Sequence, residues 1–124
     1  MLLKEFLDYV REDFGAEPEY LWENSPDTYA IRHKDNAKWF ACGMRVSGRV
    51  LHLETDRMYD IVNLKADPML VGSIRMEPGI LPAYHMNKTH WITVLLDGTA
   101  DDALIRVLTE DSFRLTAKKR SRKE

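Results

Sequence analysis

The two ends of this 124-residue chain carry amphipathic helical patterns, and a series of short strand-like segments lies between them. Residues 1–14 and the segment after residue 99 both place apolar side chains three and four positions apart. A helix with one apolar stripe must bury it against a second layer, and the strands between the two helices are available to form that layer. The pattern therefore predicts an α+β fold, a two-layer sandwich.

The middle of the chain predicts a mainly antiparallel sheet, because turn residues separate its strand-like segments. Asp35-Asn36 and Ser47-Gly48 each follow one such segment and precede another, as in β-hairpins. In the second segment, alternation is expected to place Phe40, Cys42, Met44 and Val46 on one face. The predicted strands cover residues 28–34, 38–46, 49–54, 59–65 and 90–96.

N-terminal, middle and C-terminal helices are expected to cover this sheet. The first spans residues 1–14, and the middle one begins at Asp67-Pro68, where an aspartate caps and a proline suits the first helical position. The last helix is expected to begin at Thr99, with Asp102 in capping-box spacing, and residues 78–89 read as an irregular loop. The predicted buried stripe of the last helix consists of Leu104, Val107, Leu108 and Leu115.

The length indicates one domain, which we place at residues 1–117, followed by a basic tail at residues 118–124. A chain of this size buries about two-thirds of its unfolded surface, so it needs no disulfide or metal to fold. No cofactor is expected. No apolar run approaches the length of a membrane span, and residues 1–5 do not resemble a signal peptide. We therefore expect a cytoplasmic protein with no membrane partner.

Charge is unevenly distributed along the chain, although the formal net charge is only −2. Residues 1–27 contain eight acidic and two basic side chains, whereas residues 114–124 contain six basic and one acidic side chain. A basic tail attracts phosphate backbones, but the same charges also suit the C-terminal end of a helix. Both interpretations remain open.

The sequence offers little for catalysis. Its one cysteine, Cys42, lies inside a predicted strand, where a free thiol usually behaves as a small buried apolar group. We find no paired cysteines, no glycine-rich phosphate loop and no hydrolase or protease motif. The chain is therefore not expected to be an enzyme.

Three sequence strings closely resemble the YjbR/MmcQ family of small bacterial proteins. They are YAIRHKDNAKWFA at residues 29–41, NLKADP at residues 63–68 and PAYHMNKTHW at residues 82–91. The resemblance covers about residues 3–119 and implies a compact α+β fold, likened to the bacterial frataxin CyaY and to secretion chaperones. The family is commonly labelled DNA-binding, with β-hairpins acting as a pair of wings, and no catalytic activity is implied.

The resemblance implies that this chain binds nucleic acid, DNA in particular, weakly and through basic side chains that contact phosphates. An aromatic side chain of the third string would stack on a base. Charged side chains at hairpin ends also discourage edge-to-edge aggregation of sheets. This is the simpler explanation for some of the basic side chains near the turns. The candidate residues are Arg32, His33, Lys34, Lys38, Arg49, Lys88, Trp91, Lys118, Lys119 and Arg120.

The alternative function is a module that binds a protein or a small ligand. One candidate surface is the acidic ridge of the first helix, because Glu5, Asp8 and Glu12 are spaced three and four apart. The other is a pocket near Trp91, although side chains in that segment also serve to satisfy the backbone of a long loop. The candidate pocket residues are Trp39, His85, Asn87 and His90.

Overall fold

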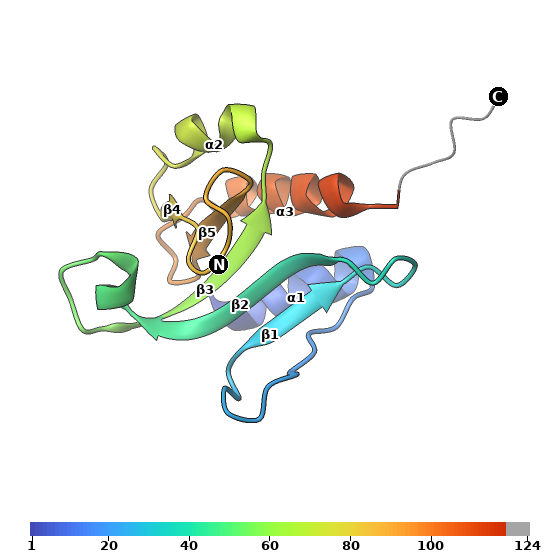
Figure 1. The fold of residues 1–124 in the computed structure, drawn as a ribbon, viewed down its shortest axis with the longest axis horizontal. Helices are drawn as coiled ribbons and strands as arrows, with labels where there is room; N and C mark the ends of the chain where they lie inside the picture. The colour runs from blue at the N-terminus through green and yellow to red at the C-terminus, as the bar shows by residue number, and fades with distance from the viewer. Residues whose placement is uncertain (119–124) are drawn as a thin grey trace.

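The computed structural model describes residues 1–118 and contains one antiparallel sheet with the strand order β1-β2-β3-β5-β4 (Figure 1). Helices α1 and α3 lie against one face of this sheet, which confirms the predicted two-layer α+β fold. We call the opposite face the open face. The elements are α1 (Leu3–Phe14), β1 (Tyr29–Arg32), β2 (Trp39–Ser47), the 3₁₀ helix η1 (Gly48–Leu51), β3 (Met58–Lys65), α2 (Pro68–Ile74), β4 (Ile80–Pro82), β5 (Trp91–Leu95) and α3 (Asp102–Thr116).

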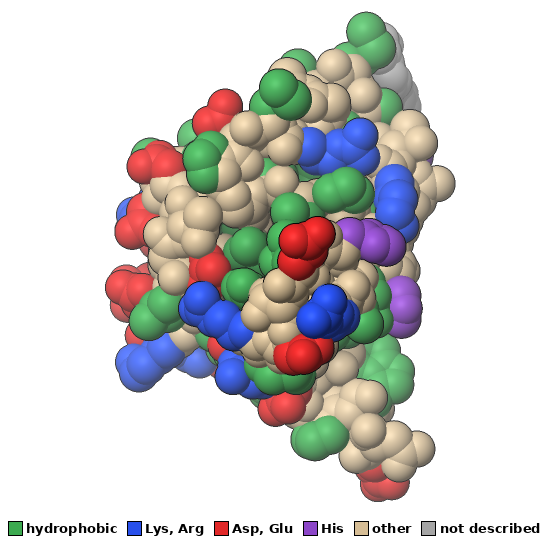
Figure 2. All heavy atoms as spheres, turned by 90° about the vertical axis from the view of Figure 1, so that its left-hand side faces the viewer, with side chains coloured by type: hydrophobic (Ala, Val, Ile, Leu, Met, Phe, Trp, Pro, Cys, Tyr) green, Lys and Arg blue, Asp and Glu red, His purple; other side chains and the backbone are tan. Residues whose placement is uncertain are grey.

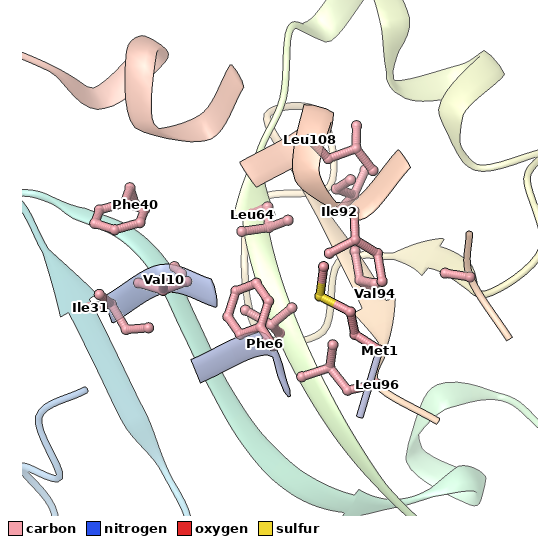
Figure 3. Packing of buried hydrophobic residues seen from close by; sticks show 14 of the residues in the cluster. Met1, Phe6, Val10, Ile31, Phe40, Leu64, Ile92, Val94, Leu96 and Leu108 are labelled. Atoms are coloured by element: carbon pink, nitrogen blue, oxygen red, sulfur yellow. The ribbon is translucent and has the colours of Figure 1, made fainter. Parts of the chain in front are cut away.

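The main core lies between the two long helices and the sheet (Figure 3). Phe6 and Val10 of α1 and Ile105 of α3 are fully buried there, as the helical spacing of α1 predicts. Gly15 ends α1 in the left-handed conformation, with a φ of 63°, and its N–H bonds the Arg11 carbonyl. No helix in residues 1–118 is long and apolar enough to cross a membrane.

A second apolar cluster lies on the open face. Ile61 of β3 and Leu95 of β5 are buried there under Leu51 of η1, with Tyr84 packed beside them. The sheet therefore has apolar side chains on both faces, and η1 together with the segment around Tyr84 covers part of the open face.

The pairing between β1 and β2 contains an irregularity of one residue. Ile31 pairs with Ala41, but Arg32 pairs with Trp39, so Phe40 is an extra residue in β2. Such a β-bulge leaves the extra residue without a direct partner and changes the phase of the side-chain alternation.

The bulge corrects the expected face of Phe40. This ring packs towards the helices, with its centroid 4.9 Å from that of Phe113. Met44 and Val46 instead join the cluster on the open face, and Cys42 contacts the buried Asn63. The expectation that Phe40 shares one face with these three residues is therefore wrong, because the inserted residue reverses the alternation.

The hydroxyl of Ser112 on α3 bridges β2 and β3 where the two strands part. It donates to the Phe40 carbonyl at 2.6 Å and accepts a hydrogen bond from the Lys65 backbone N–H at 2.9 Å. The last regular pair of this ladder is Ala41 with Leu64, so the serine replaces the next ladder bond.

Two local predictions in the sheet region are wrong. Residues 49–54 do not form a strand, because the Ser47 hydroxyl accepts a hydrogen bond from the Arg49 N–H at 3.1 Å and starts η1. Residues 78–89 are not a continuous loop, because Ile80–Pro82 pairs with β5 and forms the edge strand β4. The other edge is covered in part, because Glu19 and Ala30 exchange two backbone hydrogen bonds beside β1.

The start and the inner face of α3 also differ from the prediction. Asp101 rather than Thr99 caps the helix, and its carboxylate accepts from the Leu104 N–H at 3.1 Å. Val107 and Leu115 are 51% and 42% exposed, so they do not belong to the buried stripe. Leu108 is buried as expected, and small polar side chains fill the space near the strands. The inward positions of α3 are Ile105, Leu108, Thr109, Ser112 and Thr116.

Replacing Ser112 by alanine should lower the free energy of unfolding by about 2–4 kcal/mol, because two buried backbone groups lose their partner. Urea unfolding followed by circular dichroism measures this change. Ser73→Ala is the matched control, since the Ser73 hydroxyl is exposed and bonds only Leu70 of its own helix. A loss in Ser112→Ala no larger than that of the control would contradict the bridge.

Gly43→Ala should destabilise the fold by about 3 kcal/mol or more, because the new Cβ would lie 2.3 Å from both the Ile61 carbonyl oxygen and the Tyr29 hydroxyl. Gly72→Ala in α2 meets nothing within 4 Å and should stabilise by about 0.5–1 kcal/mol. The melting temperatures of the two variants should therefore move in opposite directions. A shift of the same sign would show that backbone freedom, rather than space, governs both sites.

Candidate functional site

The turn between β1 and β2 is fastened to the C-terminal end of α3. His33 Nε2 lies 2.8 Å from the Thr116 hydroxyl, and the Asn36 side-chain amide donates to the Thr116 carbonyl at 3.0 Å. Because the Thr116 hydroxyl itself donates to the Ser112 carbonyl, His33 donates from Nε2. His33 is only 6% exposed, and its side chain holds the turn against α3.

Three of the predicted phosphate-binding lysines meet at this end of the molecule. Lys34 and Lys38 flank the turn, and Lys118 follows α3; all three are exposed. None of them forms an ion pair within residues 1–118. Lys34 and Lys118 line one hollow of about 300 Å³ together with Asp35 and the ends of α1 and α3. The negative ends of both helix dipoles therefore favour lysines here.

Arg32 belongs to the same end but is already bound. Its guanidinium donates to both carboxylate oxygens of Glu19, from Nε at 2.9 Å and from Nη2 at 2.6 Å. This hydrogen bond holds the pKa of Glu19 below its usual value, so the pair stays charged at neutral pH. A bidentate pair of this kind leaves Arg32 little capacity for a phosphate.

Arg49 lies at the opposite end of the sheet. The nine residues of β2 separate η1 from the β1–β2 turn, a distance of about 30 Å at 3.3 Å per residue. Figure 1 shows η1 and the turn at opposite ends, as expected when successive hairpin connections alternate. Arg49 pairs with Asp56 at 2.9 Å, and acidic and basic side chains are interspersed over this end in Figure 2.

The remaining candidates are not gathered with the lysines. Lys88 is exposed and lines a small hollow of about 120 Å³ with His52 and Tyr84. Trp91 is half-buried at the start of β5, where it pairs with Lys65. Lys119 and Arg120 lie outside the described residues.

The predicted ligand pocket is only partly formed. A hollow of about 560 Å³ lies over the open face, and we call it the open-face hollow. His85 lines it, and Trp39 stands behind the lining residue Trp22 with its ring 5.8 Å away. Asn87 instead holds its own loop, because its Oδ1 accepts from the Thr89 and His90 backbone N–H groups. The open-face hollow is lined by Trp22, residues 24–28, Met44, Arg45, Val46, Tyr84 and His85.

A buried polar pair that we did not anticipate fixes one wall of this hollow. Asn63 and Thr93 are 1% and 0% exposed and are hydrogen-bonded to each other. The Tyr84 N–H donates to the Thr93 hydroxyl at 2.8 Å, and the Asn63 amide donates to the Tyr84 carbonyl at 3.1 Å. The polar residues in otherwise apolar strands are the sequence signal for this arrangement.

The acidic ridge of α1 is largely engaged with its own helix. Glu5 accepts from the Leu2 N–H at 2.7 Å, and Asp8 forms ion pairs with Lys4 and Arg11. The hydrogen bond from Lys4 is the main cause that lowers the pKa of Asp8. Within the described residues, no group of three or more His, Cys, Asp or Glu is arranged to hold a metal ion.

Cys42 is buried, as predicted, and burial raises the pKa of its thiol to about 11. The thiolate is the reactive species, so native Cys42 should react with Ellman's reagent at pH 8 at least about 100-fold more slowly than the urea-unfolded chain. The native rate should keep rising up to about pH 11, whereas the unfolded rate should level off above about pH 8.5. Native and unfolded rates within a factor of ten of each other would contradict this prediction.

Comparison with known proteins identifies the family. The YjbR family model matches residues 14–115. YyaQ of Bacillus subtilis is 39% identical over 117 residues, which cover 94% of this chain and 99% of YyaQ, and YjbR of Escherichia coli K12 is 39% identical over 92% of this chain and 86% of its own. A crystal structure of a Pseudomonas syringae protein superposes with a TM-score of 0.91 at 45% identity, covering 94% of this chain and all of that one. The chain therefore belongs to the YjbR family.

Proposed function

We propose that this YjbR-family protein is a non-enzymatic cytoplasmic domain that binds DNA weakly through its basic end. We define the basic end as Lys34, Lys38, Lys118 and the tail that follows. One observation carries the proposal: three lysines without carboxylate partners in the described part of the chain meet where the basic tail begins. Phosphate contacts of this kind fix position on a duplex and carry no sequence information.

The charge pattern supports weak and sequence-independent binding. Four further basic residues follow Lys118 in the sequence, whereas the turn contributes one acidic residue, Asp35, and the C-terminus another, Glu124. The arginines at positions 11, 32, 45, 49 and 114 are paired with carboxylates, whereas Lys34, Lys38 and Lys118 form no ion pair within residues 1–118. The net charge of −2 opposes approach to DNA and keeps the expected affinity low.

Of the two alternative functions, small-ligand binding is better supported by the structure than a protein partner on α1. A protein partner on the acidic ridge of α1 is not favoured, because Glu5 and Asp8 already have partners within their own helix. A small-ligand site is favoured by one observation, the open-face hollow lined by Trp22 and His85. The two sites use different residues, so both functions can coexist.

The triple substitution Lys34→Gln, Lys38→Gln and Lys118→Gln should weaken binding to labelled duplex DNA and flatten its dependence on salt. Each lost phosphate contact reduces the slope of log affinity against log salt by about 0.9, so three contacts reduce it by about 2–3. Fluorescence anisotropy between about 50 and 200 mM salt, with single-stranded DNA and RNA for comparison, measures both quantities.

The control is the triple substitution Lys65→Gln, Arg75→Gln and Lys88→Gln, which removes the same charge from other surfaces. It should retain the affinity, and its slope of log affinity against log salt should change by no more than about 0.9, the contribution of one phosphate contact. Equal losses in the two variants would mean that net charge, and not the basic end, drives binding. No binding of the unaltered protein at 50 mM salt would rule out the proposed function.

A further inference from the structure

The open-face hollow is built from three segments that are distant in the sequence. Met44 and Val46 of β2 line it, Trp22 and residues 24–28 before β1 line it from a second segment, and Tyr84 and His85 line it from a third. Its volume of about 560 Å³ lies within the usual range for small-molecule sites, about 300–1,000 Å³. The hollow is thus large enough for a ligand of one or two rings.

The two outer segments both carry aromatic rings. Trp22 is held edge-on by Trp39, at a ring distance of 5.8 Å and an interplanar angle of 86°. In the other segment, the rings of Tyr84 and His85 are stacked at 4.0 Å and 14°. Flat aromatic side chains such as these bind planar rings by stacking, which is tolerant of the exact ring identity.

The wall formed by Tyr84 and His85 is set in place before any ligand binds. The Tyr84 backbone is held at both its N–H and its carbonyl by the buried Asn63 and Thr93. His85 has a φ of 61°, a left-handed conformation that non-glycine residues keep only where their surroundings determine it. A wall held in this way lowers the entropy lost on binding.

Most polar side chains that line the hollow have no partner in residues 1–118, and one of them, Asp27, is charged. Within residues 1–118, the side chains of Asn24, Ser25, Asp27 and Thr28 make no hydrogen bond or ion pair. Arg45 is neutralised by Asp60 at 3.1 Å. The carboxylate of Asp27 therefore leaves the lining negative, which favours an amino donor and repels a phosphate.

We infer that the open-face hollow binds a planar nitrogen heterocycle that bears amino groups and no phosphate, with the chemistry of a free nucleobase or nucleoside. Trp22 and the Tyr84–His85 pair supply the stacking surfaces, and Asp27 accepts from the amino group. This binding is independent of the proposed DNA binding at the basic end.

Isothermal titration calorimetry on the full chain tests the inference with adenosine, guanosine and cytidine as probes. At least one nucleoside should bind saturably, and its 5′-monophosphate should bind more weakly. Trp22→Ala should weaken the binding about tenfold, the loss expected for one stacking partner. Asp27→Asn should also weaken it about tenfold, because a charged acceptor is lost.

Two variants of the same segment serve as controls. Tyr20→Ala removes an exposed ring and Glu23→Gln removes an exposed carboxylate, and neither residue lines the hollow. Both should bind within a factor of two of the unaltered protein, and circular dichroism confirms that each variant is folded. The triple lysine substitution at the basic end should leave nucleoside affinity unchanged, which separates this inference from the DNA proposal.

Three results would overturn the inference. The first is the absence of saturable binding by all three nucleosides up to about 10 mM. The second is binding that survives both Trp22→Ala and Asp27→Asn unchanged, because the ligand would then sit elsewhere. The third is tighter binding of a monophosphate than of its nucleoside, because the lining would then attract the charge that it is expected to repel.

Discussion

One extra residue in β2 determines which side chains reach which face of the sheet. Because Phe40 has no direct partner in β1, its ring turns to the helices and its carbonyl is left for the Ser112 hydroxyl. The same irregularity places Trp39 opposite Arg32, on the open face, where it supports Trp22. The contact of Phe40 with the helices and the position of Trp39 behind Trp22 therefore depend on a single insertion.

The parts of the fold that the sequence predicts are those that local patterns determine. The apolar stripe of α1 and the Asp67-Pro68 start of α2 are properties of neighbouring residues, and both are confirmed. The bulge at Phe40, the η1 helix and the short strand β4 depend on partners elsewhere. Residues Ile80–Pro82, for example, form a strand only because β5 lies beside them. Periodicity within the segment itself carries no sign of such a partner.

The sequence predicts the candidate sites only in part, as it does the fold. The basic residues are visible in the sequence, but which of them are neutralised is a property of the fold. Arg32 lies 13 positions from its partner Glu19, and no local rule links the two. Of the predicted pocket residues, His85 lines the open-face hollow and Trp39 lies behind Trp22. Trp22, Asp27 and Met44 were missed because three separate segments must meet before a cavity exists.

The two edges of the sheet differ in length, but both expose few backbone groups that could pair with another strand. On one side Glu19 already occupies the outward backbone groups of Ala30, and on the other β4 has only three residues and ends at Pro82, which has no N–H to donate. A further strand, whether from a peptide or from a second copy, finds few free ladder positions at either edge. Both edges are therefore poor starting points for strand addition, whether it would extend the sheet or build a fibril-like polymer.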